Sequence, residues 1–142
     1  MIVLDTNVLS ALMRDRPDAV VVAWLDAQAS ESLWTTSITL FEIGLGLELL
    51  PDGRRRAALK EALRGLIEED LAGRVLVFDA PAAAQAARLA AERQRNGRPV
   101  DFRDTQIAGI ALARRAGIAT RNLRHFQDLS VPVVSPWGDT LT

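Results

Sequence analysis

The side chains that could do chemistry in this sequence stand at the ends of apolar runs. Asp5 directly follows the run at residues 2–4 and opens the tetrapeptide Asp-Thr-Asn-Val. A short apolar run rich in β-branched residues predicts a buried parallel strand, and open α/β sheets bind ligands beyond the carboxyl ends of such strands. We therefore expect Asp5 to point into a cleft. Taken alone, however, this residue favours the simpler role of capping a following helix, which Asn7 could also fill.

Three further polar side chains occupy the same place in the pattern, just beyond a predicted strand or at the start of a helix near it. They are Glu42, Asp104 and Asn122. Parallel topology brings such positions to one edge of a sheet, so we expect these side chains to converge with Asp5. This convergence favours a functional site over four independent structural roles.

Each of the three also has a structural explanation. Thr39 and Glu42 have the spacing of a capping box, and Asp101 and Asp104 resemble one. Asn122 could cap a short turn before His125. We assign Asp101 to a helix cap. His125 is assigned to structural support beside Phe126, with a contact to RNA as the alternative. No side chain offers an obvious general base.

Three carboxylates gathered in one place repel one another strongly. Two carboxylates about 4 Å apart repel by roughly 4 kcal/mol at an effective dielectric of about 20, so three pairs cost on the order of 10 kcal/mol. This is comparable to the whole stability of a domain, roughly 5–15 kcal/mol. Protons or a divalent cation must relieve the repulsion, and oxygen ligands select hard cations such as Mg²⁺ or Mn²⁺. These ions commonly accompany phosphodiester hydrolysis.

Length and composition limit the remaining classes. A chain of 142 residues with 49% hydrophobic residues suits one domain with one core. No apolar run approaches the ~20 residues of a membrane span, and the early carboxylate argues against a secretory signal. We therefore expect a cytoplasmic protein without a membrane partner. Because the sequence has no cysteine, a metal site must use oxygen ligands or the single histidine.

The net charge of −1 argues against a generally basic nucleic-acid-binding protein, but the charge is uneven. Nine arginines and three acidic residues lie between positions 88 and 125. This local excess could bind a nucleic-acid backbone. It could equally reflect a general use of arginine in place of lysine, since Lys60 is the only lysine.

Alternating strands and helices are needed to position these groups. Strand-like runs occur at residues 2–4, 33–35, 75–78, 118–120 and 131–134. Helical spacing occurs at residues 17–28, 38–50, 54–70, 80–95 and 103–116. The alternation predicts an α/β fold with a parallel sheet, and the absence of repeats and linkers predicts a single domain over residues 1–142.

The helix predicted at residues 38–50 is apolar on nearly every side. Its interior glycines, Gly44 and Gly46, each cost roughly 1 kcal/mol relative to alanine, which suggests that another backbone or a partner packs close to them. So little polar surface also predicts that the helix contacts another chain.

These residues resemble the PIN-domain ribonucleases, and within them the VapC-type toxins of bacterial toxin–antitoxin pairs. The match spans nearly the whole chain and rests on four segments in this order: residues 1–7, 37–46, 104–108 and 119–126. The closing segment 131–137 and the stretch Gly-Arg-Arg-Arg at residues 53–56 also resemble the FitB subgroup.

The resemblance implies a PIN-like three-layer α/β/α fold with a central parallel sheet of about five strands. It implies Mg²⁺-dependent cleavage of RNA, with Mn²⁺ as a substitute, and Asp5, Glu42 and Asp104 as acidic ligands. The fourth family position, often aspartate, is Asn122 here, which leaves the choice between one and two metals open. Side chains that orient ligands or waters are expected at Thr6, Asn7 and Thr120.

The resemblance also implies partners. It implies a homodimer and an antitoxin whose C-terminal segment crosses the active site, so that two toxin–antitoxin heterodimers could form a dimer. The apolar helix at residues 38–50 and the helix that follows residue 53 suit the antitoxin contact. Five arginines are expected to flank the cleft and hold the RNA backbone: Arg95, Arg98, Arg103, Arg121 and Arg124.

Other functions remain as alternatives. An aspartate-based phosphatase also begins with an aspartate after its first strand, but its second acid is replaced here by Asn7. A receiver domain needs a lysine near the site, and Lys60 lies in a different region. No glycine-rich nucleotide-binding loop follows the first strand. A non-catalytic protein of the same fold that sequesters RNA or an antitoxin is the remaining alternative, although all three acids are present.

Overall fold

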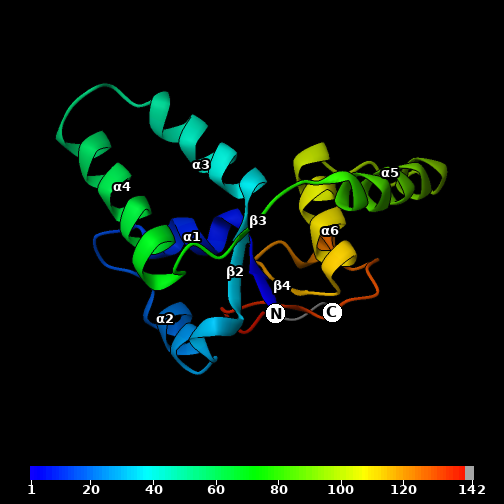
Figure 1. Ribbon diagram of the computed structural model, residues 1–142, viewed down its shortest axis with the longest axis horizontal. Coiled ribbons are helices and arrows are strands. Elements are labelled where there is room, and N and C mark those ends of the chain that lie inside the picture. The colour runs from blue at the N-terminus through cyan, green and yellow to red at the C-terminus, as the bar shows by residue number, and fades with distance from the viewer. Residues whose placement is uncertain (140–142) are drawn as a thin grey trace.

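A computed structural model of the protein describes residues 1–139, so the last three residues of the predicted domain lie outside the described part. Its centre is a five-stranded sheet with the order β3-β2-β1-β4-β5 (Figure 1). All four strand pairs are parallel. The strands are β1 Ile2–Leu4, β2 Leu33–Thr36, β3 Val75–Leu76, β4 Gly117–Ala119 and β5 Val133–Val134.

The helices are α1 Thr6–Leu12, α2 Ala19–Asp26, α3 Ser37–Glu48, α4 Arg54–Gly65, α5 Ala80–Arg95 and α6 Phe102–Arg114. Short 3-10 turns occupy Ser30–Ser32 and Leu123–His125, and a π-helical segment, Leu66–Asp70, continues α4. Within the described range, no helix is both long and apolar enough to cross a membrane.

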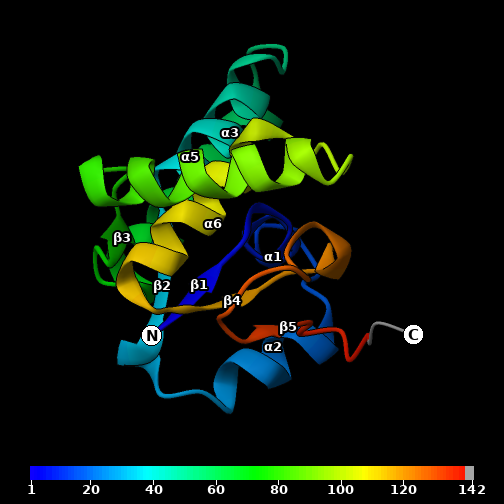
Figure 2. The ribbon, with the colours of Figure 1, turned by 90° about the vertical axis from the view of Figure 1, so that its right-hand side faces the viewer.

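The two faces of the sheet bury two separate apolar clusters. Successive strand side chains point to opposite faces, so Val3 contributes to one cluster and Leu4 to the other. Helices α5 and α6 cover the face of Val3 and lie in front of the strands in Figure 2. Helices α1, α2 and α3 pack on the face of Leu4, to the left of the strands in Figure 1. This arrangement confirms the predicted three-layer α/β/α fold.

A glycine allows α5 to approach α6 closely. A Cβ atom at Gly109 of α6 would lie 2.6 Å from the carbonyl oxygen of Ala82 and 2.7 Å from the Cβ of Ala86. Only a glycine lets the two backbones come this near. The contact fixes α6, whose first turn carries one of the predicted site residues, against α5.

The strand order creates a crevice at the carboxyl end of β1. From β1 the chain moves to β2 on one side, whereas from β4 it moves to β5 on the other. Such a reversal is where open α/β sheets bind ligands. Asp5 follows β1 and Thr120 follows β4, so both stand at this crevice.

Several element predictions need correction. Strand 75–78 ends at Leu76 because the chain turns there, with Asp79 N donating to the carbonyl of Val77. Helix 17–28 begins at Ala19, because the Asp18 side chain accepts from Val20 N and caps it. Helix 54–70 is an α-helix only to Gly65.

Two further differences concern helices near the crevice. Helix α1 was expected only as a helix that Asp5 could cap and had no predicted bounds, because its seven residues are too few to show a helical period. The close backbone approach predicted at Gly44 and Gly46 is wrong within this chain, since a Cβ atom at either position would meet nothing within 4 Å.

Candidate active site

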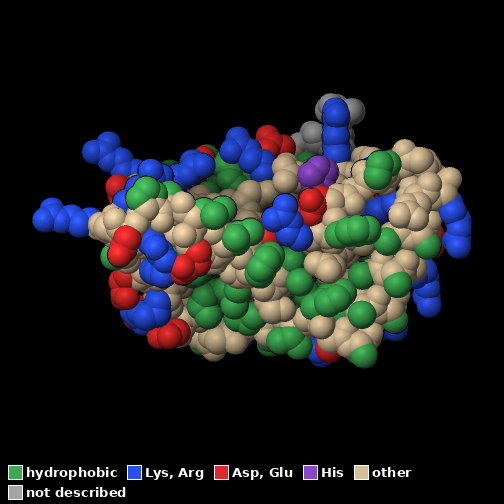
Figure 3. Space-filling view, turned by 90° about the horizontal axis from the view of Figure 1, so that it is seen from above, with side chains coloured by type: hydrophobic (Ala, Val, Ile, Leu, Met, Phe, Trp, Pro, Cys, Tyr) green, Lys and Arg blue, Asp and Glu red, His purple; other side chains and the backbone are tan. Residues whose placement is uncertain are grey.

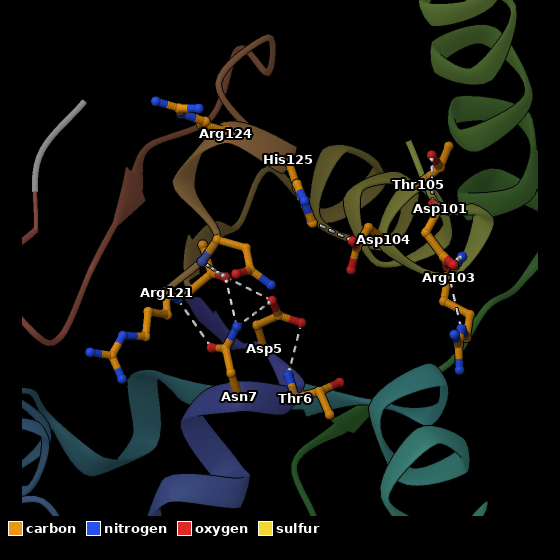
Figure 4. A network of polar contacts seen from close by, with 12 residues as sticks. Asp5, Thr6, Asn7, Asp101, Arg103, Asp104, Thr105, Arg121, Arg124 and His125 are labelled. Carbon is orange, nitrogen blue, oxygen red and sulfur yellow. Dashed lines mark hydrogen bonds and ion pairs between the residues drawn. The ribbon is translucent and has the colours of Figure 1, made fainter. Parts of the chain in front are cut away.

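Asp5 lies at the centre of the crevice and is 2% exposed. Its backbone extends the β1–β4 ladder, because Asp5 N donates to the carbonyl of Ala119 at 2.9 Å. Its side chain caps α1 by accepting from Thr6 N at 2.8 Å. The other carboxylate oxygen accepts from the hydroxyl of Thr120 at 2.7 Å (Figure 4). The capping role expected of Asp5 is therefore confirmed, and it leaves the carboxylate facing the crevice.

Burial raises the pKa of Asp5 from its ordinary value of 3.8 to about 6. The hydrogen bonds from Thr120 and Thr6 oppose this rise in pKa, whereas the nearby charges of Asp104 and Glu42 add to it. A buried carboxylate that faces other carboxylates gains stability from a proton or a cation. Perturbed titration of this kind is typical of functional sites.

Glu42 reaches the crevice from α3. The Thr36 hydroxyl accepts from Thr39 N at 3.1 Å and caps the helix, so the predicted capping box of Thr39 with Glu42 is wrong. Strand β2 extends to Thr36, which moves the start of the helix back to Ser37. Glu42 is then free to accept from the Thr6 hydroxyl at 2.9 Å, and its second oxygen lies 3.8 Å from an Arg103 nitrogen.

Asp104 enters the crevice from the first turn of α6. Asp101 caps this helix through Arg103 N at 2.8 Å, which confirms the cap expected there. Asp104 pairs with the imidazole of His125, whose Nδ1 lies 2.7 Å from its carboxylate (Figure 4). The half-exposed ring of His125, expected to support the structure beside Phe126, thus also lines the same crevice. The sequence indicated this location only through the position of His125, three residues after Asn122.

A second layer of polar contacts surrounds the acids. The Thr120 hydroxyl accepts from Asn122 N at 3.0 Å while it donates to Asp5. The Asn7 side chain donates to Asp5 at 3.5 Å and accepts from Arg121 N at 3.1 Å. These bonds fix the chain that leaves β4 against the chain that leaves β1.

The four predicted site residues line one open cavity of about 520 Å³. Sequence reasoning missed three other side chains of its wall: Ser10, Arg14 and Trp137. Figure 3 shows His125 at the surface beside acidic and basic side chains, with apolar side chains gathered next to them. The cavity is thus open to a large polar substrate.

The predicted arginines divide into two groups. Arg103 and Arg121 line the cavity, and the guanidinium of Arg121 lies 4.8 Å from the centre of the Trp137 ring. The other three lie outside its wall: Arg95, Arg98 and Arg124. Arg98 instead donates to the carbonyl of Arg124 at 2.9 Å, and the Arg124 side chain points away from the acids (Figure 4).

The donor set suits a hard cation, because three carboxylates from three elements face one cavity and the central one is buried. As the side chains of the described residues are placed, no three acidic or histidine groups are close enough to enclose an ion. Glu42 is tied to Thr6 and Asp104 to His125. Metal binding would therefore require the carboxylates to rotate towards one ion, which is compatible with these hydrogen bonds because a carboxylate can accept a hydrogen bond while it binds a cation.

Comparison with known proteins agrees with this geometry. The PIN domain family model matches residues 2–131. The chain is 40% identical to the VapC ribonuclease Y4jK of Sinorhizobium fredii over 96% of its own length and 98% of that protein. It is 38% identical to the toxin FitB of Neisseria gonorrhoeae over 98% of its length and all of that protein. The crystal structure of FitAcB from Neisseria gonorrhoeae is also similar, with a TM-score of 0.86, 38% identity and coverage of 96% of this chain and 99% of that one.

Proposed function

The chain belongs to the PIN-domain family, and we propose that it is a metal-dependent endoribonuclease that acts as the toxin of a toxin–antitoxin pair. The observation that carries the proposal is the convergence of Asp5, Glu42 and Asp104 on one cavity at the topological switch point of the sheet. The relatives named as a VapC ribonuclease and as the toxin FitB support the same activity and biological role.

The acids would serve as ligands. Asp5, Glu42 and Asp104 would hold Mg²⁺ or Mn²⁺, which supplies the positive charge that activates a water and stabilises the leaving oxygen in phosphodiester hydrolysis. Thr120 and Thr6 orient Asp5 and Glu42 through their hydroxyl groups. Asn122 adds an amide at the rim in place of a fourth charge.

The substrate class follows from the charge and shape of the cavity. Arg14, Arg103 and Arg121 line its wall, where they can neutralise phosphates of a bound strand. The Trp137 ring beneath Arg121 adds an aromatic surface of the kind that binds unpaired bases. These features suit RNA with an accessible single-stranded region. We propose that the protein cleaves it in the cytoplasm.

Exposed apolar side chains on α3 support the proposed protein partners. The exposed fractions are 60% for Phe41, 41% for Leu45 and 77% for Leu49, the C-cap residue of α3. A groove between α3 and α4, lined in part by Leu47 and Leu63, lies on the same helix pair. An amphipathic segment of an antitoxin would bind such a groove, and the remaining apolar surface would join two copies of this chain. A dimer of toxin–antitoxin heterodimers then follows.

Incubation of the purified protein with a total RNA pool tests the activity. Discrete fragments should form with Mg²⁺ or Mn²⁺ and should be absent with EDTA or in the Asp5→Asn variant. Their ends would identify the target sequence. A folded protein, free of antitoxin, that leaves the pool intact with both metals would contradict the nuclease and favour sequestration of RNA or antitoxin.

A further inference from the structure

Arg93 is a buried charge that the proposed chemistry does not use. It lies near the end of α5, is 3% exposed and is the only buried basic residue in the part of the chain that the structure describes. It does not line the cavity of the acids. Because burial of a guanidinium is unfavourable unless its donors are satisfied, its partners indicate what holds it there.

Those partners belong to two other segments. The Nε and Nη2 atoms of Arg93 each donate to Asp128 at 2.9 Å in a bidentate pair. The Nη1 atom donates to the Thr105 hydroxyl at 2.9 Å, and Nη2 also donates to the carbonyl of His125 at 2.6 Å. The hydrogen bonds from Arg93 lower the pKa of Asp128, which keeps this pair ionic. One side chain thus joins α5, α6 and the turn after β4.

Two of these bonds flank the contact between Asp104 and His125. Thr105 directly follows Asp104 in α6, and the carbonyl that Arg93 binds is that of His125 itself. The imidazole Nδ1 of His125 lies 2.7 Å from the Asp104 carboxylate, which completes the connection between the two residues. Arg93, which lies outside the cavity, therefore fixes the relative position of Asp104 and His125 in the cavity wall.

We propose that Arg93 is a positioning residue for the nuclease site, which sets the place of Asp104 and His125 through bonds to Thr105 and to the His125 backbone. The inference rests on the proposed function but adds a residue to it. A merely structural ion pair would only lower the stability when removed. A positioning residue changes the site in molecules that remain folded.

The single histidine of the chain supplies a probe that does not depend on activity. The imidazole ¹⁵N and ¹H resonances of His125 can be assigned directly and compared between the wild type, Arg93→Met and Arg93→Lys. The control is Arg88→Met, an exposed arginine on the same helix. Circular dichroism establishes that each variant is folded, and kcat and KM for RNA cleavage are measured beside it.

We expect Arg93→Met to shift the His125 resonances and to lower kcat by about 10- to 100-fold, with KM close to the wild-type value. Arg93→Lys, which retains the charge and part of the bonding, should fall between the wild type and Arg93→Met. Arg88→Met should match the wild type in both measurements. A folded Arg93→Met protein with unchanged resonances and unchanged kcat would overturn the proposal.

Two milder variants serve if Arg93→Met does not fold. Thr105→Val removes the bond from Arg93 to α6 together with the 3.3 Å bond from the Thr105 hydroxyl to the carbonyl of Asp101. Asp128→Asn weakens the bidentate pair without changing its shape. At least one of them must shift the His125 resonances, and two folded variants with wild-type spectra would reject the positioning role. If the wild type cleaves no RNA, the nuclease proposal fails while the resonances still decide the role of Arg93.

Discussion

The hydroxyl of Thr120 donates a 2.7 Å hydrogen bond to the carboxylate of Asp5, although 115 positions separate the two residues. The bond joins the ends of β4 and β1, the two strands at the switch point. The same hydroxyl accepts from Asn122 N, so one side chain connects the buried acid to the amide residue of the rim.

Removal of this hydroxyl should weaken the site. Thr120→Val deletes a bond that lowers the pKa of Asp5, so the pKa should rise above about 6. In the proposed metal site an ionised Asp5 would hold the cation, so the acidic limb of the pH–rate profile should move to higher pH. Thr120→Ser retains the hydroxyl and serves as the control. Identical profiles for the wild type and Thr120→Val would refute this role.

Neutralisation of Asp5 should stabilise the metal-free protein. The pKa of Asp5 is about 6 in the folded chain and 3.8 ordinarily, a difference that corresponds to about 3 kcal/mol. Because the pKa of Asp5 is raised on folding, ionised Asp5 lowers the free energy of unfolding by the full amount above pH 6. This destabilisation disappears as the pH falls towards 4. The free energy of unfolding of Asp5→Asn at pH 7.5 should exceed that of the wild type by about 1–2 kcal/mol, because the lost Thr120 hydrogen bond offsets part of the difference.

Denaturant unfolding in EDTA at pH 4 and pH 7.5 measures this gain. The advantage of Asp5→Asn over the wild type should be confined to the higher pH. A variant that is less stable than the wild type at pH 7.5 would show that the hydrogen bonds of the Asp5 carboxylate outweigh its desolvation.

Two of the three arginines of the cavity wall, Arg103 and Arg121, should contribute to the binding of RNA. Arg103→Gln and Arg121→Gln should each weaken binding and reduce the salt dependence of log K by about 0.7 for each lost phosphate contact to a single strand. Arg124→Gln is the matched control, because its side chain points away from the acids. Binding to a short RNA by catalytically inactive Asp5→Asn protein over a range of salt concentrations measures the slopes. Equal slopes in all the proteins would count against contact at this wall.

The apolar surface of α3 should govern self-association. Phe41→Asp and Leu45→Asp alter side chains that are 60% and 41% exposed, so the fold should be retained while a dimer dissociates. Val20→Asp on α2, 55% exposed, is a control on a different helix. Sedimentation at several concentrations distinguishes monomer from dimer. A wild type that sediments as a monomer throughout would remove the homodimer from the proposal.

The position of the site could be predicted because the carboxyl ends of parallel strands lie at one edge of the sheet. Asp5 and Asn122 lie far apart in the chain, yet apolar runs before them were enough to bring them to one edge. Helix α1 could not be recognised in the same way. Its seven residues span too few turns to show a period, and its apolar side chains merge with those of β1.

Side-chain contacts across the fold explain what else was missed. The burial of Arg93 depends on its pairing with Asp128, which lies 35 positions away in the chain. The charge distribution along the sequence does not reveal this pairing. His125 lies in the same turn as Leu123, but the direction of its ring towards Asp104 is set by the packing of that turn on α6. The sequence pattern predicts which element carries a residue, whereas the roles of Arg93 and His125 depend on the direction of their side chains.

The Mg²⁺ dependence of the cleavage rate tests the central claim most directly, with a defined RNA taken from the mapped fragments. The wild type should show a saturable rise in rate that EDTA abolishes. Asp104→Asn should need a much higher Mg²⁺ concentration or lose activity altogether, while it stays folded and binds the RNA. A rate that is insensitive to EDTA, or an Asp104→Asn protein with the Mg²⁺ dependence of the wild type, would contradict a metal site built from these acids.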